Sequence, residues 1–223
     1  LVRNALAFAL SGGLDEAEVL IVPHACDSLQ GLGSLLIDFI RPRQPVLPLY
    51  LPRGRRACDA DYMAAELRSL YRRLQEITGR TPGDDELGRC IQREEAADRL
   101  LAELDRQRRV LPLTQYEFYR LIRSREYLPA ETFSRLAQSV LAQAGQTPQA
   151  GLPILLSGIL PEPMNVFEFI AEMDGLVVAD DLAGCGRRLY RPGASGDPFC
   201  RMAEGLLTAP PDPMHGSPIS QRL

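Results

Sequence analysis

An apolar run at residues 18–28 that ends abruptly in polar residues is the feature that most constrains the fold of this chain. The run reads Glu-Val-Leu-Ile-Val-Pro-His-Ala-Cys-Asp-Ser. Its β-branched residues, over positions 17–22, are typical of a buried parallel strand. A helical pattern follows over residues 28–40, where leucine and isoleucine recur on one face. A buried strand that leads directly into a helix predicts an α/β fold with a parallel sheet.

Cys26 lies in the turn between this strand and this helix, two residues after His24. Ligands of open α/β sheets collect just beyond the carboxyl ends of the strands. With Asp27 or Ser28 as the N-cap, Cys26 would lie at the positive end of the helix. A thiolate is favoured there and could hold a metal or an anionic cluster. The alternative is a small apolar residue that packs in the turn, and spacing alone favours this alternative.

A strand, a helix and a second strand are predicted after a linker at residues 147–151. The first strand, of the buried type, spans 152–156, the helix spans 162–171 and the second strand spans 175–179. Ser157-Gly158 follows the first of these strands, and Asp180-Asp181 follows the second. Because a right-handed crossover joins such strands, they are expected to pair in parallel. Their polar ends then lie at one edge of the sheet.

Between these two regions, the pattern is that of long helices. We expect them at residues 61–78, 81–109, 114–124 and 129–144, with Thr81 as an N-cap before Pro82 in the second. The sequence therefore predicts three parts: a first α/β domain at 1–58, a helical insertion at 59–146 and a second α/β domain at 147–223. The last part holds only two predicted strands, so it is predicted to be incomplete.

Composition narrows the functional classes. The 223 residues carry a formal net charge of −4, which does not favour a nucleic-acid surface. No secretory signal and no apolar run of about 18 residues is present, so no membrane span is expected. The five cysteines are scattered without a C-x-x-C pair; they are Cys26, Cys58, Cys90, Cys185 and Cys200. We therefore expect a cytoplasmic protein whose thiols are free or bound to metal.

The other polar groups at strand ends have simple alternatives. Ser157 lacks a G-x-S-x-G context and is more often a turn residue. Adjacent carboxylates at Asp180 and Asp181 could bind a cation, but they are also common caps. The turn that contains Arg187 could bind an anion such as a CoA phosphate, or it is only a tight loop. Another basic loop, at residues 53–56, is more often solvated than a phosphate contact.

Two motifs in a fixed order resemble those of the 2-hydroxyacyl-CoA dehydratase and benzoyl-CoA reductase family. Val22-Pro23-His24-Ala25-Cys26-Asp27 is similar to its motif of a strand followed by Cys-Asp. Leu156-Ser157-Gly158, followed by Val177-Val178-Ala179-Asp180-Asp181-Leu182, is similar to its second signature. The long helical block between the motifs also fits. The resemblance covers nearly the whole chain, and the ordered pair is more specific than either motif alone.

The resemblance implies an enzyme that works as a heterodimer of related subunits. Each subunit of the family holds a [4Fe–4S] cluster between two flavodoxin-like or Rossmann-like α/β domains, with three cysteines from separate strand ends. A separate ATP-dependent iron–sulfur activator supplies single electrons. The acyl-CoA thioester is reduced to a ketyl-type radical, and either water is eliminated or an aromatic ring is reduced. The sequence does not separate these two reactions.

The resemblance also assigns roles to residues of this chain. Cys26 matches the second cluster ligand, and His24 is either a proton donor near the substrate or a structural histidine. Ser157 is a candidate catalytic and substrate-binding residue. The other candidates for substrate binding are Gly158, Asp180, Asp181 and Arg187. Cys185 does not align cleanly with a ligand position.

The missing ligands predict that this chain is an internal fragment. The first ligand is expected just before Leu1 and the third beyond Leu223, so the fragment alone is expected to be inactive. Two other functions stay open. One is an electron-transfer paralogue with a double-cubane cluster, and the other is a non-redox α/β binding module in which Cys26 only packs.

Overall fold

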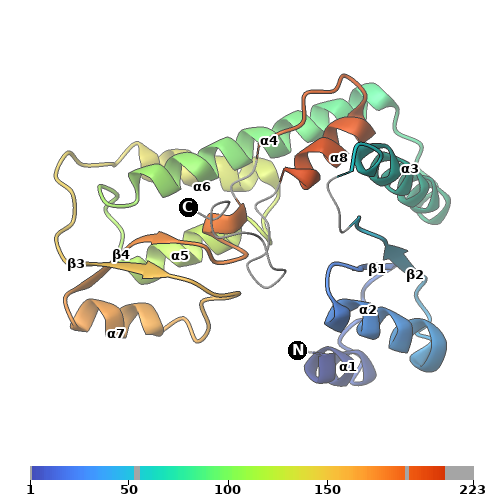
Figure 1. Cartoon of the computed structure of the whole chain (residues 1–223), viewed down its shortest axis with the longest axis horizontal. Helices are drawn as coiled ribbons and strands as arrows, with labels where there is room; N and C mark the ends of the chain where they lie inside the picture. Colours follow the sequence, from blue (N-terminus) through green and yellow to red (C-terminus); the bar gives the residue numbers. More distant parts are fainter. Residues whose placement is uncertain (1, 53–55, 189–190, 209–223) are drawn as a thin grey trace. The chain divides into compact units, whose positions relative to one another are not determined.

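The computed structural model describes the chain except for residues 1, 53–55, 189–190 and 209–223. The described residues form eight α-helices and two parallel sheets of two strands each, so the predicted α/β class is confirmed (Figure 1). Because each sheet has only two strands, the flavodoxin-like arrangement of the two domains is not confirmed. No helix in this part of the chain is long and apolar enough to cross a membrane.

Contacts divide the chain into two compact units. Unit 1 contains Leu1–Pro82 and Gly193–Leu207, and unit 2 contains Gly83–Pro192. A C-terminal helix thus belongs to the same unit as the N-terminal strands. The three-part division at residues 58 and 146 stays a prediction, because grouping by contacts and division by sequence pattern describe different properties of the chain.

Unit 1 begins with the predicted strand, turn and helix. Its elements here are α1 (Val2–Leu10), β1 (Leu20–Pro23), α2 (Asp27–Ser34), its π-helical continuation η1 (Leu35–Ile40) and β2 (Val46–Leu49). β1 pairs with β2 in parallel, from Leu20 opposite Val46 to Pro23 opposite Leu49. Arg41 adopts a left-handed backbone with φ of 48° and ends η1. The predicted strand and the helix after it are therefore present, in a parallel sheet of two strands.

Gly33 allows α2 to approach the end of β1. A Cβ atom at Gly33 would lie 3.1 Å from His24 Nε2 and 3.3 Å from Val22 Cγ1. A Cβ atom at Gly31 would meet no atom within 4 Å. Of the two glycines in this helix, Gly33 therefore serves close packing against the strand, and Gly31 faces open space.

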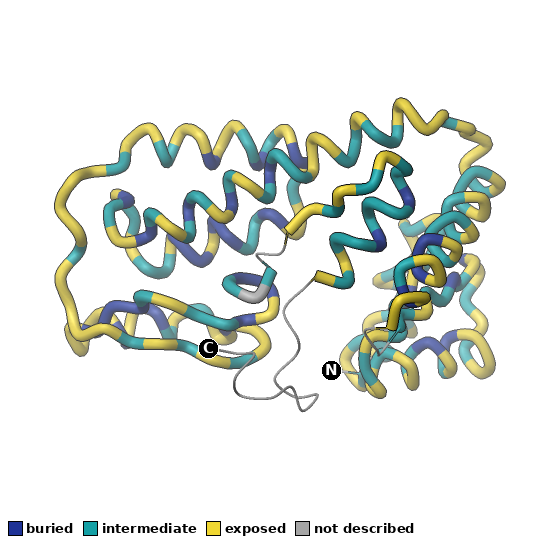
Figure 2. The backbone as a smooth tube through the Cα atoms, turned by 45° about the horizontal axis from the view of Figure 1, so that its top comes forward, coloured by how far each residue is buried: buried dark blue, intermediate teal, exposed yellow. Residues whose placement is uncertain are grey.

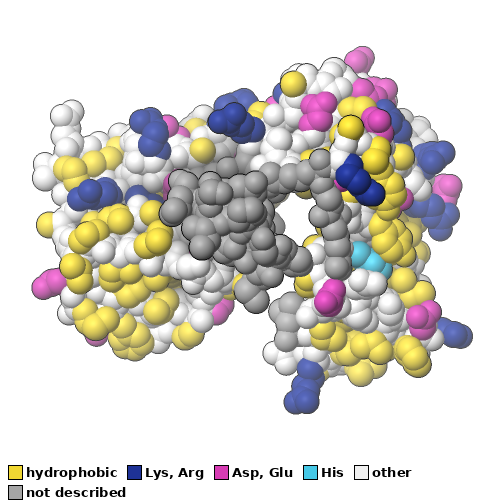
Figure 3. Space-filling model, in the orientation of Figure 1, with side chains coloured by type: hydrophobic (Ala, Val, Ile, Leu, Met, Phe, Trp, Pro, Cys, Tyr) yellow, Lys and Arg dark blue, Asp and Glu magenta, His cyan; other side chains and the backbone are white. Residues whose placement is uncertain are grey.

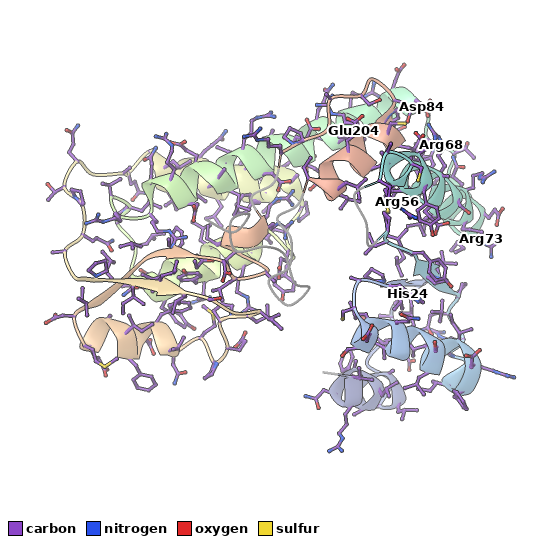
Figure 4. All side chains as sticks on the ribbon, viewed as in Figure 1. His24, Arg56, Arg68, Arg73, Asp84 and Glu204 are labelled. Atoms are coloured by element: carbon purple, nitrogen blue, oxygen red, sulfur yellow. The ribbon has the colours of Figure 1, made fainter. Side chains whose placement is uncertain are left out.

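The rest of unit 1 is a pair of helices from distant parts of the sequence. α3 (Asp59–Thr78) packs on α8 (Pro198–Leu207). Arg68 Nη2 donates to Asp197 Oδ2 at 2.6 Å, and its guanidinium lies 5.1 Å from the Phe199 ring centroid. Glu204, labelled with Arg68 in Figure 4, accepts the backbone N–H groups of residues 194 and 195 at 2.7 and 3.0 Å. These polar contacts order the segment that leads into α8.

Unit 2 contains the remaining helices and the second sheet. Its elements are α4 (Asp84–Gln107), α5 (Gln115–Ser124), α6 (Ala130–Leu141), β3 (Leu152–Leu156), α7 (Val166–Glu172), β4 (Gly175–Asp180) and the short 3-10 helix η2 (Gly186–Arg188). β3 and β4 pair in parallel, with an irregularity between Ile154 and Leu155. Buried side chains of the four helices and of β4 form one core (Figure 2). Within it, the Tyr119 and Phe167 rings stack with centroids 4.0 Å apart.

Two local predictions in unit 2 are wrong. β3 is not a buried strand, because Leu152 and Leu155 are 66% and 72% exposed. The strand has a single neighbour, and Figure 3 shows hydrophobic side chains gathered over β3 and α7. The helix predicted to begin at Thr81-Pro82 begins at Asp84 instead, with Gly83 as its N-cap. The Pro82 carbonyl accepts a hydrogen bond from Tyr71 Oη at 3.1 Å and lies before the helix.

Candidate functional site

The predicted site residues lie at the ends of three strands, in two different units. His24 and Cys26 follow β1 in unit 1. Ser157 and Gly158 follow β3, and the Asp180-Asp181 pair ends and follows β4, all in unit 2. Within unit 2 the structure brings its two predicted pairs together, because Leu156 pairs with Asp180 in the parallel sheet.

Cys26 is itself the N-cap of α2. Its backbone is extended, with φ of −147° and ψ of 167°, and its carbonyl accepts the Gln30 N–H at 2.9 Å. The prediction that Asp27 or Ser28 would be the cap is wrong by one or two residues, because Asp27 is already the first residue of the helix. The half-buried Cys26 makes no side-chain capping hydrogen bond. Its thiol thus lies at the N-terminal end of α2, which carries the partial positive charge of the helix dipole.

His24 is held between β2 and α2. Its backbone N–H donates to the Leu49 carbonyl at 2.8 Å and extends the ladder of the β1–β2 pair. Its ring meets the Tyr50 ring edge-on, with centroids 4.5 Å apart. Nε2 is buried, lies against Gly33 and has no hydrogen-bond partner among the described residues. The backbone of His24 is therefore structural, while this ring nitrogen is not used by the fold.

The cysteines of the described chain do not form a cluster site. No group of three or more His, Cys, Asp or Glu side chains in this part of the chain could hold a metal ion. Cys58 is the exposed N-cap of α3, Cys90 and Cys200 lie within helices, and Cys185 is buried. Because a [4Fe–4S] cluster is held by several cysteine thiolates, the described residues do not fit a complete cluster. Cys26 alone has the position expected of a ligand.

Ser157 and Gly158 lie between two hydrogen bonds that join the loops after β3 and β4. The Asp181 N–H donates to the Leu156 carbonyl at 3.0 Å, and the Ala183 N–H donates to the Ile159 carbonyl at 3.0 Å. These two bonds bracket the Ser157-Gly158 pair. Ser157 is exposed, so its hydroxyl is available at this edge of the sheet.

Asp180 is the most enclosed of the predicted site residues. Its side chain is 0% exposed. Oδ2 accepts a hydrogen bond from Arg108 Nη2 at 2.8 Å and another from Tyr119 Oη at 2.7 Å. Oδ1 accepts the backbone N–H groups of Leu182 at 3.1 Å and Gly186 at 2.8 Å. A ligand could reach this carboxylate only after the loop had moved, so the geometry does not favour direct substrate contact by Asp180.

The environment of this carboxylate shifts the pKa values of its neighbours. Burial, together with the negative charge of Asp180, raises the pKa of Tyr119, so its hydroxyl stays protonated. Burial lowers the pKa of Arg108, but Asp105, Tyr119 and Asp180 outweigh this effect, and the net shift is upward. Burial raises the pKa of the Cys185 thiol to about 12, with Asp180 adding to the effect. Cys185 is therefore a neutral core thiol near neutral pH.

The loop after β4 has two further anchors beyond Asp180. Cys185 packs in the core of unit 2, and the Arg188 guanidinium lies 3.8 Å from Glu126 Oε1. The backbone of Arg187 is part of η2, whereas its side chain lies outside the described residues. Its predicted contact with an anion stays a prediction.

Comparison with known families decides which protein class this is. The sequence profile of the family described as "2-hydroxyglutaryl-CoA dehydratase, D-component" matches residues 1–223, the whole chain. The chain belongs to this family. The resemblance noted in the two motifs is thereby confirmed. No curated protein matches the chain at a significant level.

Membership in the D-component family has two direct consequences. The chain is a subunit of the dehydratase type, and a D-component implies at least one partner subunit in a complex. The two predicted sets of site residues lie in different units of this D-component, and each set follows the carboxyl end of a parallel strand.

Sequence reasoning missed the residues of the D-component that hold Asp180. Tyr119 is a core residue, and its hydroxyl also binds Asp180. Arg108 lies at the C-terminal end of α4, where a basic residue is common without any special role. Gln115 was also missed; its amide accepts the Val177 N–H at 2.7 Å and donates to the Gly175 carbonyl at 2.8 Å. No local signal in the sequence indicates the hydrogen bonds that these three side chains make with β4 and its end.

An open depression in the D-component adjoins the C-terminal half of α5. Its volume is about 360 Å³, and its lining includes Arg120, Arg123 and Tyr127. Arg123 also pairs with Glu162 in the loop after β3, and this hydrogen bond raises the pKa of its guanidinium. The loop beyond β3 is thus flanked by positive charge, and the charge of Arg123 is shared with a carboxylate.

Proposed function

We propose that this D-component is a subunit of an iron–sulfur enzyme that acts on acyl-CoA thioesters by one-electron chemistry. The observation that carries the proposal is the family match over residues 1–223, together with the place of Cys26 at the N-terminus of α2. The reaction is dehydration of a 2-hydroxyacyl-CoA through a ketyl-type radical. Reduction of a benzoyl-CoA-type ring is the related alternative. The protein would work in the cytoplasm with a related second subunit.

Cys26 is proposed as one thiolate ligand of a [4Fe–4S] cluster. Three observations support this role. Cys26 follows the carboxyl end of β1, it lies at the positive end of α2, and its thiol makes no capping hydrogen bond. The remaining ligands would come from outside the described residues, because these contain no further cluster of suitable groups. An ATP-dependent iron–sulfur activator would deliver the electron, as the resemblance to this family implies.

The other predicted residues would serve the acyl-CoA. His24 is a candidate proton donor because its Nε2 is unused by the fold. The exposed hydroxyl of Ser157, with Gly158 beside it, is proposed to contact the substrate. Asp181 and Arg187 follow β4 in the neighbouring loop and are proposed as further contacts.

A comparison of two cysteine variants tests the cluster. The complete protein is purified without oxygen as wild type, Cys26→Ala and Cys58→Ala, and its iron and sulfide are measured. Both cysteines are N-caps in unit 1 without a side-chain capping hydrogen bond, so Cys58→Ala is a matched control. We expect about four iron atoms per subunit in wild type and in Cys58→Ala. We expect loss of iron in Cys26→Ala.

Other outcomes would redirect the proposal. Unchanged iron in Cys26→Ala contradicts ligation by this residue. An intact cluster in a protein that binds no acyl-CoA indicates the electron-transfer paralogue. A stably folded complete protein without iron or sulfide indicates a non-redox binding module.

A further inference from the structure

We propose that Asp180 is a positioning residue, whose buried carboxylate folds the loop after β4 and thereby holds Ser157 and Gly158 in place for the thioester. The part that concerns the thioester rests on the proposed function. The proposal assigns Asp180 an indirect role, through the backbone of the loop, in place of direct contact with the substrate.

Asp180 joins elements that are distant in sequence. Arg108, at the end of α4, precedes Asp180 by 72 residues, and Tyr119 of α5 precedes it by 61 residues. Both donate to Oδ2, and their own groups are linked, since Arg108 Nη1 donates to Tyr119 Oη at 3.3 Å. A carboxylate with no exposed surface is stable only when donors surround it in this way. Oδ2 is therefore fixed by the helical part of unit 2.

The Oδ1 atom of Asp180 shapes the loop after β4. The N–H groups of Leu182 and Gly186 converge on this one oxygen, so the chain between them must turn around it. A Cβ atom at Gly186 would lie 2.0 Å from the Asp180 carbonyl oxygen, which leaves room for glycine alone. Leu182 and Cys185, which point into the core, are 3% and 2% exposed. The conformation of the loop therefore depends on the carboxylate and on the core together.

Two backbone hydrogen bonds connect this loop to the edge of the sheet that carries Ser157. The loop residue Ala183 donates to the Ile159 carbonyl, and Asp181 donates to the Leu156 carbonyl, each at 3.0 Å. Ser157 and Gly158 lie between these two anchor points. Loosening of the loop would release the Ile159 anchor and give the Ser157 hydroxyl more positions. Preorganised groups bind a substrate better than mobile ones, because less conformational freedom is lost on binding.

Tyr119→Phe tests the proposal, because it removes one of the four donors and keeps the ring that stacks on Phe167. Thr114→Ala is the matched control. It destabilises the same helix, α5, by removing the Thr114–Glu117 capping box, and it leaves every Asp180 contact in place. Both are measured in the complete D-component assembled with its partner subunit and activator, with 2-hydroxyglutaryl-CoA as the probe.

We expect Tyr119→Phe to raise KM for the probe by about five- to tenfold, the effect of one lost hydrogen bond, with kcat nearly unchanged. Backbone amides of residues 181–186 should exchange with solvent faster in this variant. Thr114→Ala should lower the melting temperature and leave KM and the exchange of these amides unchanged.

Equal changes of KM in the two variants, or an unchanged KM in Tyr119→Phe, would overturn the proposal. An inactive wild-type complex would instead contradict the proposed function. In that case amide exchange still tests the role of Asp180: slow exchange of residues 181–186 in Tyr119→Phe would show that the carboxylate does not hold the loop.

Discussion

The ends of β4 and β1 both carry predicted site residues, but they differ in how far these residues are hydrogen-bonded within the protein. At the end of β4, the Asp180 carboxylate is fully buried and accepts four hydrogen bonds from the protein. At the end of β1, the Cys26 thiol makes no capping hydrogen bond, and His24 Nε2 has no partner among the described residues. The protein itself thus satisfies the Asp180 carboxylate, whereas it leaves His24 Nε2 without a hydrogen bond from the described residues.

This difference separates a carboxylate that the fold uses from a ring nitrogen that the fold does not use. A buried charge is costly unless it is paired and hydrogen-bonded, so Asp180 and Arg108 depend on each other. A buried polar atom without a partner, such as His24 Nε2, offers the fold no such gain and calls for a functional explanation. Stability and ligand binding should therefore respond to different substitutions.

The largest effect on stability is expected for Asp180→Ala. It leaves the buried Arg108 guanidinium without its partner on β4, which should lower the free energy of unfolding by about 3–5 kcal/mol. Cys26→Ala removes no capping hydrogen bond and should change the free energy of unfolding by less than about 0.5 kcal/mol. Chemical denaturation of the complete protein without bound metal measures both. Similar losses in the two variants would remove the distinction between the two edges.

A smaller effect is expected for Gly186→Ala. The new Cβ atom would overlap the Asp180 backbone and lie 2.8 Å from Oδ1, so the loop must shift. We expect a loss of about 1–3 kcal/mol in the free energy of unfolding. Gly88→Ala is the control within unit 2, because its Cβ would meet no atom within 4 Å and alanine favours helix. The interpretation of the loop is wrong if Gly186→Ala is as well tolerated as Gly88→Ala.

A comparison of the two glycines in α2 sharpens the description of the β1 edge. Gly31→Ala should stabilise the protein by about 0.5–1 kcal/mol, since it adds helix propensity in open space. Gly33→Ala should lack this gain, because its Cβ would press on His24 and Val22. Thermal unfolding distinguishes them. Equal stabilisation by both substitutions would show that α2 does not pack tightly on β1.

The smallest effect is expected in the modification of the Cys185 thiol by iodoacetamide. With a pKa of about 12, it remains protonated at pH 8, and it is also buried. Iodoacetamide should therefore modify the exposed Cys58 and leave Cys185 unmodified in the folded protein, as read by mass spectrometry of peptides. Modification of Cys185 at the same rate as Cys58 would mean that the loop opens readily and that its core anchor is weak.

Local patterns in the sequence predicted several elements well. α3 ends at Thr78 before Gly79, which adopts the left-handed backbone with φ of 66° that suits glycine. The helix predicted at residues 114–124 is α5, and Thr114 is its N-cap. Wrong predictions arose where a contact from elsewhere decided the outcome. Tyr71 binds the Pro82 carbonyl, and the following helix starts two residues later than expected.

The sequence by itself determined the parallel order of strands and helices and the place of Cys26 at a helix N-terminus. Hydrophobic periodicity and capping residues act over a few positions, so they can be recognised without the fold. Only the tertiary structure decided that α8 packs on α3 and that Asp180 is held by Arg108 and Tyr119. These contacts join residues more than 60 positions apart, and their energy depends on burial that no local pattern records.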